Sequence, residues 1–247
     1  MSGRKGVALV IVLLLSLMML ATAKGQSNLV ENCKSANVDS RESGILVAAI
    51  KVCTEALATP DISPATTANL LMIRGVAFRN AGALDLSLSD LDKSVEMAPQ
   101  SATNLRMRAW TLRVIGKLPD ALNDYDRVLK MEREFQGLLS RCNILIELRN
   151  LPVALADCQE SLNSNRNPDS LFMTAFLHEK LGAPELAIPL LQEAVGRDDA
   201  EARAFLLLSE IAAKKGDKEL AIKIANDGLK MHANDQSLID HLAEIAK

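Results

Sequence analysis

The stretch "LMIRGVAFRNAGALDLSLSDLDKSVEMAP", residues 71–99, decides the fold, because the chain repeats it. The segment "LRMRAWTLRVIGKLPDALNDYDRVLKMER", residues 105–133, carries apolar, small and Gly residues in the same order. Three further copies begin at Leu138, Leu171 and Phe205, and successive copies are offset by 34, 33, 33 and 34 residues. A fixed period of this length is typical of proteins built by stacking one supersecondary unit.

Each copy is predicted to form two antiparallel amphipathic helices, because apolar residues recur three or four positions apart in both halves. A Gly, which can adopt the left-handed conformation that ends a helix, separates the halves at Gly82, Gly116, Gly182 and Gly216. A Pro stands near the start of the second helix, where its missing N–H costs little, at Pro119, Pro152 and Pro184. Pro189 lies deeper and is expected to bend its helix slightly.

Small residues recur at one position of each helix, and two helices can approach closely only where side chains are small. In the first helix these residues are Gly75, Ala109, Cys142, Ala175 and Ser209. In the second helix they are Ser87, Ala121, Ala154, Ala187 and Ala221. The mostly larger residues four positions later are expected to fill the space between hairpins: Leu91, Tyr125, Cys158, Leu191 and Ala225.

This pattern resembles the tetratricopeptide repeat family, which places W-x2-L-G-x2-Y before A-x3-F and P over 34 residues. The first two copies match it at Leu71, Gly75, Phe78, Ser87, Leu91, Pro99, Leu105, Ala109, Leu112, Ala121 and Tyr125. The second motif Leu is replaced by Arg74, Arg108, Arg141 and Thr174, and only Leu208 fits. The resemblance implies an all-α, right-handed α-solenoid that binds other proteins, without identifying a partner.

The resemblance divides the chain into a leader, a cap, five repeats and a second cap. The repeats are expected at 68–101, 102–134, 135–167, 168–201 and 202–235. Residues 24–67 are expected to form a degenerate N-terminal unit, with a short helix from Leu29 to about Ala36 before the helical segment 45–60. Residues 236–247 are expected to form a C-terminal helix that covers the last hairpin, as solenoid ends require.

The N-terminal segment reads as a secretory signal peptide cleaved near Ala23. Arg4 and Lys5 precede fourteen uncharged residues, and the small residues Ala21-Thr22-Ala23 follow them. The chain would then be secreted, which in a bacterium means the periplasm. A membrane-spanning helix requires ~20 apolar residues, yet an uncleaved membrane anchor remains an alternative.

Charge argues against nucleic acid as the main partner. Arg4 and Lys5 account for two of the 28 Lys and Arg, so cleavage would leave 26 against 31 Asp and Glu, a net charge of −5. Nucleic-acid-binding proteins usually carry a basic patch.

The four cysteines are interpreted through the oxidising compartment, where pairs tend to form disulfides. Cys33 and Cys53 fall on the two helices of the degenerate first unit, and we expect them to be bridged. Cys142 and Cys158 lie on the two helices of the third hairpin, where either a bridge or two small buried thiols would fit.

No catalytic constellation, cofactor motif or metal site is evident in the sequence. It lacks a Gly-rich phosphate loop, HExxH, G-x-S-x-G and CxxC, and its three His residues are scattered. His178 is interpreted as a packed core residue and His241 as part of the polar face of the last helix.

In the resembling family, first-helix positions 2, 5, 9 and 12 face a concave groove. Carried over, these positions hold the only Trp of the chain, Trp110, with Arg106 four residues before it and Arg113 three residues after it. Trp and Arg are enriched in binding hot spots. The candidate groove residues are Arg79, Arg106, Trp110, Arg113, Asn143, Phe172, Phe176 and Glu179. The alternative is that Trp110 and Phe176 only cover neighbouring hairpins.

These observations predict a non-enzymatic scaffold that binds a peptide or helix of a partner protein in its groove. The alternatives are a membrane-anchored adaptor in a cell-envelope complex and a structural role without a single ligand. A hydrolytic or glycan-processing site in the groove is disfavoured by the few His residues and the lack of paired carboxylates. The family's chaperone-type carboxylate clamp is not expected, because Met72 and Val76 replace its Lys and Asn in the first copy.

Overall fold

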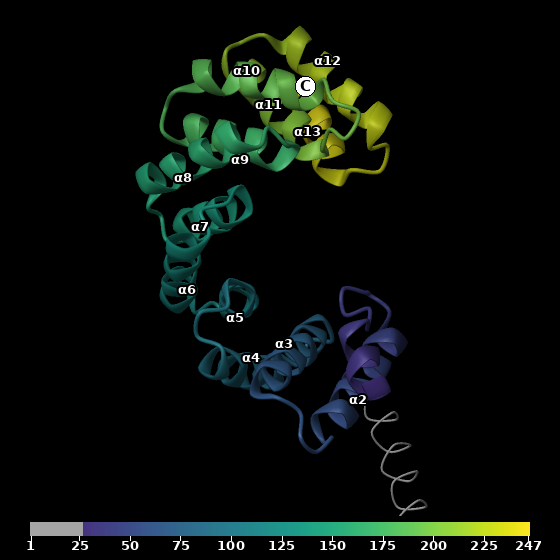
Figure 1. The fold of residues 1–247 in the computed structure, drawn as a ribbon. Coiled ribbons are helices and arrows are strands. Elements are labelled where there is room, and N and C mark those ends of the chain that lie inside the picture. The colour runs from purple at the N-terminus through teal and green to yellow at the C-terminus, as the bar shows by residue number, and fades with distance from the viewer. Residues whose placement is uncertain (1–26) are drawn as a thin grey trace, which may run out of the picture. The chain divides into compact units, whose positions relative to one another are not determined.

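The computed structural model describes residues 27–247, and within this range every regular element is a helix (Figure 1). The predicted all-α repeat fold is confirmed. The predicted leader, residues 1–23, lies outside the described residues. No helix of the described part is long and apolar enough to cross a membrane.

The helices follow one another as hairpins. Helical residues 27–34 precede α2, Ser43–Leu57. The five hairpins that follow are α3 Pro64–Asn80 with α4 Leu84–Met97, α5 Ala102–Val114 with α6 Leu118–Met131, α7 Phe135–Glu147 with α8 Leu151–Ser164, α9 Pro168–Lys180 with α10 Pro184–Val195, and α11 Ala202–Lys214 with α12 Lys218–Met231. The last helix is α13, Gln236–Ile245.

Helix α3 begins at Pro64, before the repeat start expected at residue 68, because an N-cap precedes it. The Ser63 hydroxyl accepts a hydrogen bond from the Thr66 N–H at 3.1 Å, and Pro64 occupies the first helical position. Both features favour a helix start. The chain divides into two compact units, the first ending at Arg127 and the second beginning at Val128, within α6.

Close packing within the hairpins depends on the small residues. Ala121, Ala154, Ala187 and Ala221 are all fully buried. At Gly75, a Cβ atom would lie 2.8 Å from Cγ of Leu91, so a larger residue would push the two helices apart. The repeated small residues therefore set the distance between the helices of a hairpin.

A buried ion pair joins the two helices of the first three hairpins. Arg74 Nε lies 2.7 Å from Asp90 Oδ2, and the pairs Arg108–Asp124 and Arg141–Asp157 have the same donor, acceptor and distance. In each pair the second guanidinium nitrogen, Nη2, donates to the other carboxylate oxygen. These Arg residues replace the second Leu of the repeat motif.

The last two hairpins lack this ion pair. The equivalent positions hold Thr174 with Leu190, and Leu208 with Ile224. The Thr174 hydroxyl turns to backbone oxygens, those of Ser170 at 2.8 Å and Cys158 at 3.2 Å. Leu208 is buried and Ile224 half-buried. These positions of the last two hairpins are therefore more apolar.

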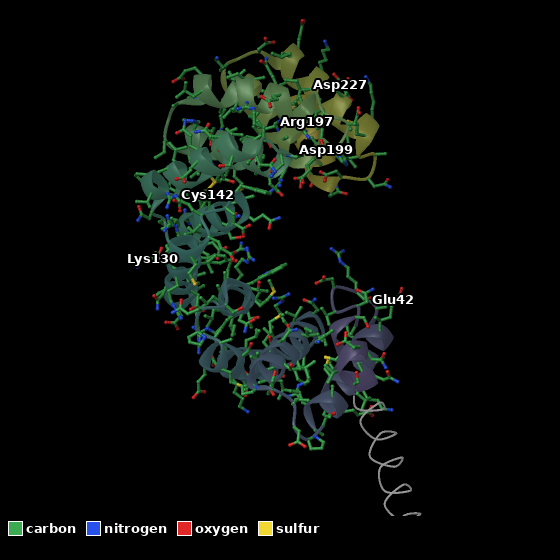
Figure 2. All side chains as sticks on the ribbon, in the orientation of Figure 1. Glu42, Lys130, Cys142, Arg197, Asp199 and Asp227 are labelled. Carbon is green, nitrogen blue, oxygen red and sulfur yellow. A yellow bond between two sulfur atoms is a disulfide. The ribbon has the colours of Figure 1, made fainter. Side chains whose placement is uncertain are left out.

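Both cysteine pairs form disulfides in the structure. Cys33 joins Cys53 with a Cα–Cα distance of 4.8 Å, and Cys142 joins Cys158 with 5.6 Å (Figure 2 labels Cys142). All four residues are fully buried. Each bridge connects two neighbouring helices.

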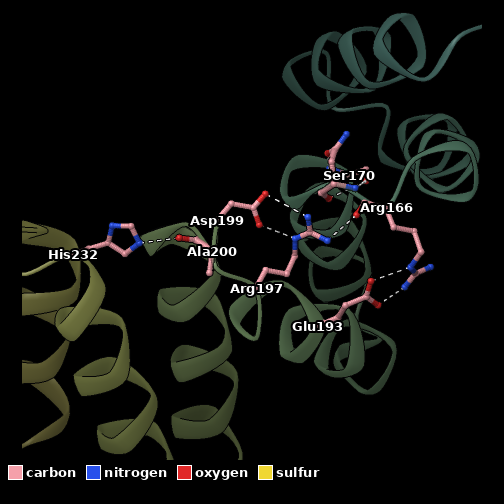
Figure 3. A network of polar contacts seen from close by, with 8 residues as sticks. Arg166, Ser170, Glu193, Arg197, Asp199, Ala200 and His232 are labelled. Atoms are coloured by element: carbon pink, nitrogen blue, oxygen red, sulfur yellow. Dashed lines mark hydrogen bonds and ion pairs between the residues drawn. The ribbon is translucent and has the colours of Figure 1, made fainter.

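Polar contacts tie together the loops of the second unit (Figure 3). Arg166 donates to both carboxylate oxygens of Glu193, and Arg197 donates to the Arg166 carbonyl at 3.2 Å as well as to Asp199. A ring nitrogen of His232 lies 2.9 Å from the carbonyl oxygen of Ala200. The Arg166–Glu193 pair is solvent-exposed, so we expect it to position the loops more than it stabilises the fold.

The structure corrects the interpretation of His241. The sequence pattern assigns this residue to the polar face of the last helix, but its Nε2 lies 2.9 Å from the Ser209 hydroxyl, and the side chain is half-buried. Ser209 is small, which leaves room for the imidazole of α13 against α11. His178 is also half-buried, and burial lowers its pKa.

The turns between paired helices require a left-handed residue, and one hairpin supplies it without Gly. Gly82, Gly116, Gly182 and Gly216 have φ between 80° and 85°, and the equivalent Arg149 has φ 61°. The left-handed conformation costs a residue with a side chain ~1–2 kcal/mol, a cost that Gly avoids. Part of this advantage of Gly is offset, because Gly loses more conformational freedom on folding.

We expect Arg149→Gly to raise the free energy of unfolding by about 0.5–1 kcal/mol. Chemical denaturation followed by circular dichroism measures the change. The matched control is Gly182→Arg, which should lower the stability by at least as much, and an unchanged or less stable Arg149→Gly variant would contradict the argument.

Candidate protein-binding surfaces

The candidate residues of the first unit gather on α3 and α5. The Ser101 hydroxyl caps α5 by accepting from the Asn104 N–H at 3.2 Å, and this start places Trp110 near the end of the helix. The Arg79 guanidinium lies over the Trp110 ring, with Cζ 4.2 Å from the ring centroid. Trp110 is 48% exposed, although it contacts the neighbouring hairpin through Arg79. A large aromatic side chain is thus held in place with much of its surface facing solvent.

The Arg79 guanidinium is hydrogen-bonded through Nε but not through Nη1. Its Nε donates to Asn80 Oδ1 at 3.2 Å, and Asn80 in turn donates to the Val38 carbonyl at 2.7 Å. The side chain is only 7% exposed, and among the described residues Nη1 has no hydrogen-bond partner. Burial lowers the pKa of Arg79, and the nearby charge of Asp39 opposes this.

An unpaired buried donor costs about 1–3 kcal/mol, more when it is charged. Nη1 is itself shielded from solvent, so a ligand oxygen would reach it and remove that cost only if the neighbouring side chains moved. Arg106 and Arg113 lie half-buried on α5, on either side of Trp110, and both are engaged in interactions within the chain. They add positive charge around the exposed ring.

A small cleft opens on the same two helices. It has a volume of about 270 Å³ and is lined mainly by small and polar residues. Asn69 and Met72 of α3 and Thr103 of α5 belong to its lining. The face made by α3 and α5 therefore offers both an aromatic surface and a shallow depression.

The candidate residues of the second unit lie on α9, whose start is fixed by a capping box. The Asn167 side chain accepts from the Ser170 N–H at 2.9 Å, and Pro168 follows the cap. Phe172 and Phe176 come one turn apart, with their ring centroids 6.1 Å from each other. Both rings pack against the buried core of α9, α10 and α11. The alternative role of Phe176, covering the hairpin, is thus present in the structure.

Cations lie over both rings. Arg203 Cζ is 4.5 Å from the Phe172 centroid, and Lys180 Nζ is 5.3 Å from that of Phe176. Arg203 also pairs with Asp169 and Glu201. Glu179 accepts from Lys214 Nζ at 2.7 Å, and the hydrogen bond from this lysine holds the pKa of Glu179 below its ordinary value.

Asn143 on α7 uses its amide within its own helix, because Nδ2 donates to the Leu139 carbonyl at 3.0 Å. The candidate residues therefore fall in two places. Arg79, Arg106, Trp110 and Arg113 belong to the first unit, and Asn143, Phe172, Phe176 and Glu179 belong to the second.

The described residues contain no group of three or more His, Cys, Asp or Glu side chains arranged to hold a metal ion. The sequence reasoning overlooked the Arg–Asp ion pairs of the first three hairpins. Their signal was an Asp 16 residues after each of Arg74, Arg108 and Arg141.

Comparison with known proteins identifies the repeats. The family model described as Tetratricopeptide repeat matches residues 172–236. No curated protein matches the chain significantly.

Solved structures share the fold at low sequence identity. YrrB, described as a TPR protein with an unusual peptide-binding site, superposes with a TM-score of 0.60 at 16% identity, covering 77% of this chain and 97% of its own. MamA from Desulfovibrio magneticus RS-1 gives 0.62 at 16% identity, covering 69% and 97%. A tetratricopeptide repeat protein from Parabacteroides merdae gives 0.55 at 20% identity, covering 91% and 100%. Residues 172–236 thus match the tetratricopeptide repeat model, and the described chain shares the fold of solved tetratricopeptide repeat proteins.

Proposed function

We propose that the chain is an exported, non-enzymatic scaffold that binds a peptide or helix of a partner protein against its first helices. Tetratricopeptide repeats are generally an interaction fold without catalysis, and the relative YrrB is described as having a peptide-binding site. Fold alone does not specify a ligand, so the proposal depends on the site.

The observation that carries the proposal is the pairing of Trp110 with Arg79. A half-exposed Trp stacked on a buried Arg offers apolar contact, and a small shift of the ring would uncover the unsatisfied Nη1 donor beside it. A peptide satisfies both needs, because its side chains can pack on the ring while a backbone carbonyl or carboxylate accepts from Nη1.

We expect Trp110→Ala to abolish capture of the partner while leaving the fold intact, because the ring is half-exposed. Affinity capture of the chain from its own host, followed by mass spectrometry, identifies the protein that depends on Trp110. Leu86→Ala is the matched control, because Leu86 is another exposed apolar residue of the first unit but lies on a second helix. Capture that survives Trp110→Ala, or that is lost equally in Leu86→Ala, would reject this surface.

A second measurement uses Trp110 as the only Trp of the chain. Titration of synthetic segments of the captured protein should shift its fluorescence, since the ring would leave water on binding. In Arg79→Met we expect the affinity to fall at least tenfold, while the free energy of unfolding changes by less than about 1 kcal/mol because a buried unpaired group is removed. An unchanged affinity would exclude Arg79 from the site.

The compartment is part of the proposal, and the N-terminal segment supports it. We expect the mature protein to begin at Lys24, as N-terminal sequencing of the chain from its host would show. A start at residue 1 or 2 would instead favour the alternative, a membrane-anchored adaptor of a cell-envelope assembly.

A further inference from the structure

A further cleft lies in the second unit, between two second helices and the first helix that packs against them. It has a volume of about 490 Å³ and is bounded by α10, α11 and α12. Its apolar lining consists of Ile188, Leu208, Ile211, Ala212, Leu220 and Ile224. Binding clefts of proteins typically have this size and such a lining.

The cleft is larger and more apolar than its equivalent in the first unit, where the ion pair is present. The equivalent position between α4 and α6 is lined by the Arg108–Asp124 pair together with Asp92, Asp120 and Asn123, and its volume is about 260 Å³. At the second-unit cleft, Leu208 and Ile224 replace the pair and Gln192 replaces Asp92. A smaller polar depression in one unit therefore corresponds to a larger apolar one in the other.

Exposed apolar residues recur at one position of the second helices of this unit. Leu220, which lines it, is 44% exposed, and Leu186, at the same position of the preceding second helix, is 52% exposed. Val153 occupies this position one repeat earlier and is exposed as well. A row of exposed apolar residues along successive helices is more surface than a single small ligand would cover.

Two lysines and two aspartates line the edge of the cleft, and both aspartates already have partners within the chain. Asp217 caps α12 by accepting from the Leu220 N–H at 3.0 Å, and Asp227, labelled in Figure 2, pairs with Lys230 at 2.6 Å. Within the described part of the chain, neither Lys215 nor Lys223 has an ion-pair partner, although both line the cleft. The edge thus presents two lysines available to an acidic ligand.

We propose that this cleft docks an amphipathic helix of a partner protein whose apolar face is flanked by acidic residues. Apolar side chains at i, i+3, i+4 and i+7 would enter the cleft and cover Leu186 and Leu220, as helices do in hydrophobic grooves. Glu or Asp residues beside that face would pair with Lys215 and Lys223. This site is independent of Trp110, so one chain could hold two partner segments.

The test uses two synthetic 18-residue peptides that share a Leu face at i, i+3, i+4 and i+7. One carries Glu at the positions beside that face and the other carries Lys. Fluorescence anisotropy of the labelled peptides with the full chain should show at least tenfold tighter binding of the acidic peptide. Equal binding of both peptides, or no binding of the acidic peptide, would overturn the proposal.

Variants place the binding in the cleft. The double variant L208R/I224D installs the ion pair that three other hairpins already contain, and we expect it to weaken acidic-peptide binding at least tenfold. Leu220→Glu changes only an exposed edge residue and should weaken binding of the acidic peptide comparably. This single variant therefore tests the cleft even if the double variant misfolds. K215E/K223E should reverse the preference between the two peptides.

Two further results would count against the proposal. If Trp110→Ala weakened the acidic peptide while L208R/I224D did not, the peptide would be using the first-helix surface. If palmitate bound in the cleft and the acidic peptide did not, the occupant would be an acyl chain. Failure of these tests would leave the Trp110 site untouched, because Trp110→Ala is expected to have no effect on this peptide.

Discussion

Asp124→Ala is expected to lower the free energy of unfolding by about 2–3 kcal/mol. Removing one partner of a buried ion pair typically costs about 3–5 kcal/mol, because the other charge is left in a poorly solvated place. Asp124 is 1% exposed and accepts from Arg108 Nε at 2.7 Å and Nη2 at 2.6 Å. Arg108 remains partly solvated and keeps Asp92 at 3.2 Å, which reduces the expected loss.

The double variant R108L/D124I should recover most of this loss and end within about 1 kcal/mol of the natural protein. Replacing both partners of a buried pair by apolar residues of similar volume is often neutral or stabilising. The chain already contains this solution, because Leu208 and Ile224 occupy the same two positions in the last hairpin. The ion pair would then add little net stability, and its main effect would be to keep the depression between α4 and α6 polar.

Urea denaturation followed by circular dichroism measures both variants. Asp92→Ala is the matched control, since Asp92 is 54% exposed and contacts the same arginine, and exposed pairs contribute about 0–1 kcal/mol. If Asp124→Ala lost no more stability than Asp92→Ala, the buried pair would not hold the hairpin together. If R108L/D124I were as unstable as Asp124→Ala, the apolar alternative would fail in this hairpin.

The repeat fold was predictable because its determinants are local and recur in the sequence. Gly82, Gly116, Gly182 and Gly216 ended the first helices where the structure has positive φ angles. The small residues marked the close contacts, as the 2.8 Å approach of Leu91 to the space beside Gly75 shows. Because the period repeats five times, the Gly turns and the small-residue positions can be recognised even where one copy lacks them.

The ion pairs could have been found in the sequence and were not. Arg74, Arg108 and Arg141 were interpreted only as departures from the family's Leu, although each is followed by an Asp at the same distance. An Arg and an Asp that recur at the same spacing in several copies, one on each helix of the hairpin, are candidates for an ion pair between the two helices. A search for charges that recur together would have exposed them.

The candidate surfaces depended on tertiary contacts that no pattern encodes. Position in the first helix identified Trp110, yet the stacking of Arg79 and its unsatisfied Nη1 arise from how α3 meets α5. Asn143 stood at an equivalent position and turned to its own backbone instead. The apolar cleft required three helices together and followed from two substitutions, Leu208 and Ile224, that look ordinary by themselves.

Removal of the Cys33–Cys53 disulfide should release the helical residues 27–34 from the rest of the fold. This helical segment is short, and isolated helices under ~12–15 residues are marginal in water. It is joined to α2 by the bridge within a small cluster that includes Ala56 and Leu70. In C33A/C53A, amide protons of residues 27–34 should therefore exchange with solvent far faster than in the natural protein.

The Cys142–Cys158 disulfide is the matched comparison, because it closes a loop of similar length. Its ends are 16 residues apart, against 20 for the first bridge, and a loop of this size is worth about 3 kcal/mol. Helices α7 and α8 are longer, however, and stay packed through Leu145, Ala154 and the Arg141–Asp157 pair. C142A/C158A should thus lower the unfolding free energy without local release of either helix.

Hydrogen exchange read by mass spectrometry separates the two outcomes, because it reports opening segment by segment. Rapid exchange confined to residues 27–34 in C33A/C53A, with a uniform loss of protection in C142A/C158A, is the expected result. Full protection of residues 27–34 without their bridge would mean that apolar packing alone holds them. The Cys33–Cys53 bridge would then only raise the overall free energy of unfolding, as the Cys142–Cys158 bridge is expected to do, and the two bridges would be equivalent.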